Sequence, residues 1–138
     1  MEISARILNS PGGHEVQLRT GGAIQALSVA ARASGQGSAV NGGELLMAAL
    51  ATCYCNDLYR EAARLAIEVT GCEVVASARF NGVGLAAESV SYAARIDSPA
   101  APERIALLLE ETDRLAEIHN TLRAGCPVRR VGWDEFAA

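Results

Sequence analysis

Hydrophobic and polar residues alternate along the first third of the chain, and this two-residue period is typical of half-buried β-strands. Three segments show the period: residues 2–8, 14–20 and 23–31. Short turns that contain paired glycines separate them, and such turns reverse the chain tightly. The pattern predicts three antiparallel strands that follow one another as a meander.

The longest apolar stretch of the chain follows these strands. Between Leu45 and Cys55 only Thr52 is not apolar, and neither Gly nor Pro interrupts the chain from there to Gly71. We therefore expect a long helix from about Gly43 to Ile67. Its first half is apolar on every side, and a helix of that kind is buried on every side.

The remaining residues predict a second hairpin, two helical segments and a last strand. The expected strands cover residues 72–80 and 88–97, the helical region opens at Pro102 and breaks near Thr112–Asp113, and a closing strand covers Cys126–Trp133 before a tail at 134–138. The resulting order is β-β-β-α-β-β-α-α-β. Strands in runs, interrupted by helices, predict a single α+β domain over residues 1–138, with the helices grouped on one side of antiparallel sheet.

Two further expectations concern the central helix: how its N-terminus is capped and what buries its apolar surface. Asn41 is a candidate N-cap, and the negative charge of Glu44 suits the first turn of a helix. One small sheet cannot cover a helix that is apolar all round. We therefore expect a homodimer, with the second copy packed around residues 45–59.

Composition limits the classes of protein that the chain can belong to. With 138 residues, half of them hydrophobic, it can form one folded domain with a real core. A net charge of −4 with scattered arginines predicts no nucleic-acid partner. The central apolar run is too short to cross a membrane, and the N-terminus lacks the pattern of a signal peptide. We expect a cytoplasmic protein without a cofactor.

Four cysteines provide the main candidate chemistry. In a reducing cytosol they are thiols. Cys53 and Cys55 stand two residues apart, which is about 200° around a helix, so they face opposite ways and cannot share one metal ion. No metal site is expected. Cys53 is either a redox nucleophile, if a cation lowers its pKa, or a small packed hydrophobe. Cys55 and Cys72 are expected to be packing residues.

A few charged residues could assist a thiol. Asp57, one turn after Cys53, is a candidate acid–base group or an ion-pair partner for Arg60 and Arg64. His119 is either a general base or a helix-face residue with a solvated ring. Arg32, at the start of a loop of small residues, is a candidate cation beside a thiolate or an anionic ligand.

The stretch that leads into the central helix resembles a known family signature. The chain reads Asn-Gly-Gly-Glu-Leu-Leu-Met-Ala-Ala-Leu-Ala-Thr-Cys from Asn41 to Cys53, and this is similar to the Asn-Pro-Glu-Glu-Leu-Leu…Ala-Ala…Cys signature of the OsmC/Ohr family. The order of the elements also matches. The resemblance implies an intertwined homodimer with active sites at its interface. It also implies a thiol peroxidase that reduces organic hydroperoxides in the oxidative stress response.

Family members use a peroxidatic Cys on the central helix, which an Arg and a Glu activate, and a resolving Cys on a later helical segment. The resemblance places Cys53 at the peroxidatic position. The activating Glu aligns with Gly43, and Glu44 lies one residue later, a step of about 100° around the helix. The family Arg follows a Gly-Gly turn, where this chain has His14, with Arg19 further along.

The resolving cysteine has two possible positions. Cys126-Pro127-Val128 is similar to the family's Cys-Pro-Val motif. However, the residues that follow the motif in the family match the sequence that begins at His119, which places the resolving position at Ala116. The number of residues between the two cysteines of the family also favours Ala116, because Ala116 lies close to that spacing from Cys53 and Cys126 lies ten residues beyond it. The resolving thiol is then missing, and Cys126 could serve only by moving to Cys53.

Two functions of different classes remain. The first is a hydroperoxide reductase that uses an external thiol as reductant, with Cys53, Cys126, Glu44 and Arg32 as the candidate catalytic residues. The second is a non-catalytic protein that binds a small apolar ligand in the cavity of the dimer interface, with Cys53 as a packed residue.

Overall fold

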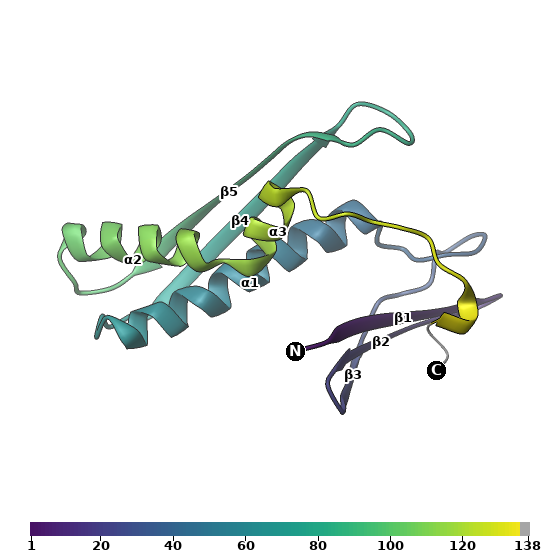
Figure 1. Cartoon of the computed structure of the whole chain (residues 1–138), viewed down its shortest axis with the longest axis horizontal. Coiled ribbons are helices and arrows are strands. Elements are labelled where there is room, and N and C mark those ends of the chain that lie inside the picture. The colour runs from purple at the N-terminus through teal and green to yellow at the C-terminus, as the bar shows by residue number, and fades with distance from the viewer. Residues whose placement is uncertain (136–138) are drawn as a thin grey trace. The chain divides into compact units, whose positions relative to one another are not determined.

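The structure, a computed structural model, describes residues 1–135 (Figure 1). The chain forms two compact units, Met1–Leu46 and Met47–Ala138, and each is described by itself. The described elements follow the order β-β-β-α-β-β-α-α and end with a 3-10 turn at Trp133–Glu135. The predicted α+β class with antiparallel sheets is confirmed.

The first unit is built on a three-stranded antiparallel sheet. It consists of β1 (Ile3–Ser10), β2 (Gly13–Thr20) and β3 (Ala23–Leu27), in that spatial order. Gly12 and Gly21 adopt positive φ angles of 78° and 56° in the two turns, a conformation that costs glycine little. The predicted meander is therefore confirmed. However, β3 ends at Leu27 rather than Ala31, because its pairing with β2 runs out there.

The long helix α1 (Gly42–Arg64) starts with a reciprocal cap. The backbone N–H of Glu44 donates to Asn41 Oδ1 at 2.9 Å, and the N–H of Asn41 donates to Glu44 Oε2 at 2.7 Å. This arrangement satisfies two otherwise free donors. The predicted cap is confirmed. The helix ends three residues before the predicted Ile67, because Ala66 takes a left-handed φ of 53° that breaks the helical path.

The second unit adds a hairpin and two shorter helices. These are β4 (Gly71–Phe80), β5 (Ala87–Asp97), α2 (Pro102–Leu115) and α3 (Glu117–Ala124). The two helices meet at Ala116 and not at the predicted Thr112–Asp113. Thr112 stays helical, and its buried hydroxyl is satisfied within the helix because it donates to the Leu108 carbonyl at 2.7 Å. Gly125, with a left-handed φ of 64°, ends α3.

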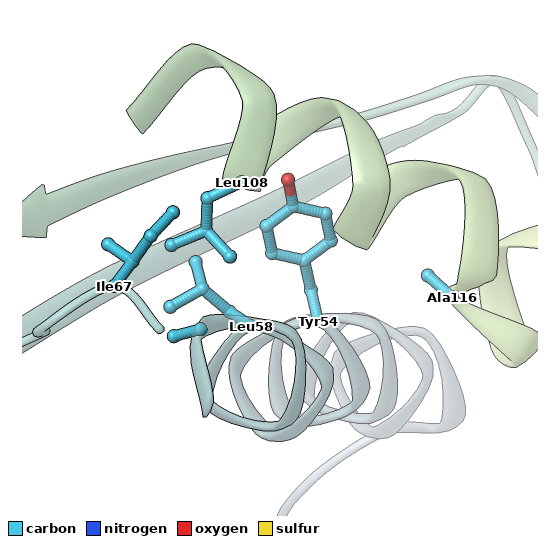
Figure 2. Close-up of a cluster of buried hydrophobic side chains, with 6 residues drawn as sticks. Tyr54, Leu58, Ile67, Leu108 and Ala116 are labelled. Atoms are coloured by element: carbon cyan, nitrogen blue, oxygen red, sulfur yellow. The ribbon is translucent and has the colours of Figure 1, made fainter. Parts of the chain in front are cut away.

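A small core joins the elements of the second unit. Figure 2 shows Tyr54 and Leu58 projecting from α1 towards Leu108 of α2. The inward residues of the hairpin pack against this cluster: Cys72, Val74, Tyr92, Ala94 and Ile96. Because both helices contribute to one cluster over one face of the hairpin (Figure 1), the prediction of helices on one side of the sheet holds in this unit.

The exposure of α1 differs from the prediction. In the single chain Leu50 and Tyr54 are buried while Ala49 and Thr52 are exposed, so the helix is not buried on every side. The homodimer that would cover it stays a prediction. Glu61, a charged residue in the second half of α1, is buried. Its two ion pairs with arginines compensate for the loss of water.

The predicted closing strand at Cys126–Trp133 is wrong. Residues 126–132 are irregular, and Trp133 begins the 3-10 turn. Pro127 lacks the backbone donor that a strand needs, and Val128 is 97% exposed. Most of the predicted tail, residues 136–138, lies outside the described residues. None of the described helices has both the length and the apolar character that crossing a membrane requires.

Candidate functional site

Cys53 lies on α1, half-buried, with two carboxylates beside its sulfur. The Cys53 Sγ–H donates to Asp57 Oδ2 at 3.4 Å, and Glu117 Oε2 lies 4.0 Å from the same sulfur. Asp57 shares a helix face with Cys53 because the two are four residues apart. Glu117 comes from the first turn of α3. The fold therefore brings α1 and the start of α3 together at this thiol.

Arg60 links the two carboxylates. Its Nη1 lies 3.0 Å from Asp57 Oδ1 and 3.6 Å from Glu117 Oε1. The predicted pairing of Asp57 with Arg60 is confirmed. Arg64, the other predicted partner, instead binds Glu61 at 2.6 Å and Glu111 at 2.7 Å. The site is thus a thiol, two acids and one arginine.

The surroundings favour the protonated thiol. Burial raises the pKa of Cys53, and the hydrogen bond to Asp57 and the negative charges of Asp57 and Glu117 raise it further. The backbone N–H of Ile118, in the first turn of α3, acts in the opposite direction and lowers the pKa. Positive charge at a helix start stabilises an anion. The Cys53 thiol is therefore a weak acid, but the Ile118 N–H can stabilise its thiolate.

Asp57 is the best-placed acceptor for the thiol proton. Its side chain is only 7% exposed. Burial raises the pKa of Asp57, while the Cys53 hydrogen bond and the charge of Arg60 lower it. Glu117, by contrast, is exposed. Its own backbone N–H, followed by its contacts with Asp57 and Arg60, lowers its pKa. Asp57 therefore combines contact with the sulfur and an affinity for protons above that of an ordinary carboxylate.

The same residues form a group that the sequence-based argument about metals did not foresee. One donor atom each of Cys53, Asp57 and Glu117 lies within 4.8 Å of the others. Thiolates and carboxylates can bind zinc. However, the Arg60 guanidinium already contacts both carboxylates and supplies positive charge there. The arrangement is that of an ion-pair cluster around a thiol.

His119 is buried between aromatic rings. It is 3% exposed, and its ring centroid lies 4.4 Å from that of Tyr92 and 5.6 Å from that of Tyr54. Neither ring nitrogen has a hydrogen-bond partner among the described residues. Burial, followed by the charge of Arg123, lowers the pKa of His119. The predicted solvated ring is wrong, and a role as general base stays a prediction.

The two candidate resolving positions differ in their surroundings. Ala116 is completely buried and directly precedes Glu117 and Ile118, both of which contact the Cys53 sulfur. Cys126 is exposed beyond α3, where its Sγ–H donates to the carbonyl of the next residue at 3.9 Å. The residues that follow Ala116 thus lie beside Cys53, and a role for Cys126 as the resolving cysteine stays a prediction.

Glu44 and Arg32 belong to the first unit. The Glu44 carboxylate is engaged in the helix cap, and the Arg32 backbone N–H donates to Gly37 in the loop at 3.0 Å. Their proposed roles beside Cys53 stay predictions. Sequence reasoning missed Glu117 as a site residue, although its position next to Ala116 was a usable signal.

Comparisons with known proteins bear on the family and the fold. The OsmC-like protein family matches the chain over residues 35–130. A search of curated proteins finds no match. The fold is similar to that of an OsmC-like protein from Mycoplasma pneumoniae, with 17% identity over 89% of each chain and a TM-score of 0.59.

Two further solved structures are similar to a comparable degree. A hypothetical protein from Aquifex aeolicus VF5 is 14% identical over 89% of this chain and 86% of that one, with a TM-score of 0.63. An organic hydroperoxide resistance protein from Elizabethkingia anophelis is 18% identical over 89% of each chain, with a TM-score of 0.61. Identities this low establish the shared fold alone. Because the family match covers more than half of the chain, the protein belongs to the OsmC-like family.

Proposed function

We propose that the protein is a thiol-dependent reductase of organic hydroperoxides, with Cys53 as its nucleophile. The observation that carries the proposal is the 3.4 Å hydrogen bond from the Cys53 sulfur to Asp57, whose second oxygen is held by Arg60 at 3.0 Å. A nucleophile in contact with a base that a third group orients is the usual arrangement for activating a thiol. The similarity to a hydroperoxide resistance protein supports the substrate class.

The first step couples proton transfer to attack on the peroxide. Asp57 accepts the Cys53 proton, and the thiolate attacks the terminal oxygen of the hydroperoxide. The S–O bond forms as the O–O bond breaks, and the departing alkoxide takes the proton from Asp57. The products are one alcohol and the sulfenic acid of Cys53, so the peroxide is reduced and the sulfur is oxidised by two electrons.

The second step uses an external thiol. One thiol condenses with the Cys53 sulfenic acid and releases water, leaving a mixed disulfide. A second thiol then displaces Cys53 and leaves as the oxidised reductant. An external donor is required because Ala116 offers no sulfur beside Cys53. Cys126 could replace the first external thiol only if the segment after α3 moved to Cys53.

Arg60 and Ile118 have positioning roles in this scheme. Arg60 orients the Asp57 carboxylate and keeps part of its charge balanced. The Ile118 N–H stabilises negative charge on the sulfur. Both groups act before an oxidant binds. The scheme thus replaces the family's Glu with Asp57, which lies on the same helix as the thiol.

The competing candidate is a non-catalytic protein that binds a small apolar molecule. The raised pKa of Cys53, beside two carboxylates, is the observation that favours it. In that case Cys53 is a packed residue, and the ligand occupies the interface of the homodimer that we propose for the exposed side of α1. A cytoplasmic location and a part in the oxidative stress response belong to the first candidate.

Peroxide consumption in the presence of excess dithiothreitol separates the two candidates. The wild-type protein should consume cumene hydroperoxide rapidly, and Cys53→Ser should lose this rapid consumption. Cys126→Ser is the matched control, since it removes an exposed thiol, and it should retain consumption. Maleimide labelling of Cys53 from pH 5 to pH 9 gives a second readout. If Cys53 labels only at alkaline pH and no peroxide is consumed, the enzyme proposal is refuted.

A further inference from the structure

A second pair of sulfurs lies in contact away from Cys53. Cys55 Sγ and Cys72 Sγ are 3.6 Å apart, and both residues are half-buried. Cys55 projects from α1, and Cys72 is the second residue of β4. Because Cys55 and Cys53 face different sides of the helix, this pair is separate from the Asp57–Arg60 cluster.

We propose that Cys55 and Cys72 form a reversible disulfide that links α1 to β4 when the protein is oxidised. A disulfide bond is about 2.05 Å long, so the two sulfurs must approach each other by about 1.5 Å. Side-chain rotation and small shifts of the helix over the hairpin can supply such a movement. The two thiols already hydrogen-bond to each other, so no third group has to leave the space between them.

The oxidant is a hydroperoxide. A thiolate of one cysteine attacks the terminal peroxide oxygen, which gives a sulfenic acid and an alcohol. The second sulfur then attacks the sulfenic sulfur and releases water. Two thiols and one hydroperoxide thus yield one disulfide, one alcohol and one water. A thiol reductant reverses the link by exchange through a mixed disulfide.

The surroundings make this oxidation slow. Burial raises the pKa of Cys72 to about 11, and the hydrogen bond to Cys55, the charge of Cys55 and the Asp97 carboxylate all act in the same direction. Few Cys72 thiolates exist at neutral pH, and only the thiolate is a strong nucleophile. The pair therefore suits a switch that responds to sustained oxidation better than a site that turns over rapidly.

The link would constrain a defined part of the fold. Between the two cysteines the chain completes α1, turns at Ala66 with its left-handed φ, and places Ile67 in the core. A cross-link there limits the freedom of the unfolded chain, which raises the stability of the oxidised form. We therefore expect oxidised protein to unfold at a higher temperature than reduced protein.

The test uses the full chain with Cys53→Ser and Cys126→Ser, which retains only the proposed pair. After treatment with cumene hydroperoxide at alkaline pH, the intact mass should fall by about 2 Da, because two hydrogens leave, and maleimide labelling should be lost. Non-reducing digestion with trypsin, which cuts after arginine, should yield peptides 33–60 and 65–79 joined together. Dithiothreitol should separate them.

The matched control adds Cys72→Ser to the same background, and it should keep one reactive thiol and form no link within the chain. If both thiols of the test protein still label after oxidation, or if links form only between chains, the proposal is refuted. Should the background variant fail to fold, the same digest of wild-type protein, with fragmentation to assign the link to Cys55, decides the question. Because the test protein lacks Cys53, failure of the proposed peroxidase leaves this result unaffected.

Discussion

The substitution Asp57→Asn tests whether Asp57 accepts the proton of the Cys53 thiol or only lies beside it. The substitution keeps the shape of the side chain and removes its charge. Both the hydrogen bond to Asp57 and the charge of Asp57 raise the pKa of Cys53, so their loss lowers that pKa. More thiolate is then present at neutral pH, and maleimide should label Cys53 faster in the variant than in the parent protein.

Peroxide reduction should change in the opposite direction. The departing alkoxide needs a proton, which a side-chain amide at this position cannot deliver as the Asp57 carboxyl does. General acid–base catalysis contributes about 10²–10⁴-fold to a rate. We therefore expect hydroperoxide consumption to fall by at least about 10²-fold while thiol labelling accelerates.

The stability change should be small. Arg60, the partner of Asp57, has a side chain that is 49% exposed, and helix pairs of this spacing contribute only about 0.3–0.5 kcal/mol. Relief of the buried charge offsets part of that loss. Urea unfolding should therefore show a change within about 1 kcal/mol, so a large loss of activity could not be attributed to unfolding.

The assay requires one reactive thiol, so both rates are measured in a background that lacks Cys55, Cys72 and Cys126. Glu111→Gln is the matched control. It neutralises a carboxylate of α2 that pairs with Arg64 and Arg114 and not with Arg60, and it should leave Cys53 labelling unchanged. If Asp57→Asn raises both the labelling rate and peroxide consumption, Asp57 only suppresses the thiol, and the proposed proton transfer is refuted.

Three further predictions test the site and the core. In a background that lacks Cys55, Cys72 and Cys126, Ala116→Cys should form a disulfide with Cys53 after peroxide treatment, seen as a mass loss of about 2 Da; two free thiols would contradict the alignment of position 116 with the resolving cysteine. Leu108→Ala should destabilise the protein by about 2–5 kcal/mol in urea unfolding, because Leu108 is completely buried in the core, and a change below about 1 kcal/mol would contradict that packing. His119 has a folded-state pKa below its ordinary value, so below about pH 6.5 the unfolded chain binds a proton that the folded chain refuses. Stability should therefore fall as the pH drops through this range, and His119→Phe should flatten the slope; an unchanged slope would refute the assignment.

Local signals in the sequence predict the elements that local interactions determine. Alternating apolar residues indicate the hairpin strands, and the spacing of Asn41 and Glu44 indicates the cap, because both depend on neighbours within a few residues. The break between α2 and α3 falls at Ala116 rather than at the predicted Thr112–Asp113, and Thr112 lies within α2 with its hydroxyl satisfied there. The predicted strand at Cys126–Trp133 does not form, because no other strand of the described chain pairs with this segment.

The members of the candidate site are harder to predict because they come from distant segments. Asp57 and Arg60 are predictable from helical spacing alone. Glu117 stands 64 positions after Cys53, and only the packing of α3 against α1 brings the two together. The burial of Glu61 is not predicted by the apolar pattern of its helix, because ion pairs with Arg60 and Arg64 accompany it.

The raised pKa of Cys53 does not by itself argue against catalysis. Each unit of increase reduces the thiolate fraction about tenfold, but a more basic thiolate is also a better nucleophile, by about threefold per unit at a Brønsted slope of about 0.4–0.5. The net cost is only about threefold to fourfold per unit, which a contacting base can offset by about 10²-fold or more. Burial of the thiol therefore slows the first step modestly. The missing sulfur at Ala116 has the larger consequence, because it makes every turnover depend on a reductant that arrives from solution.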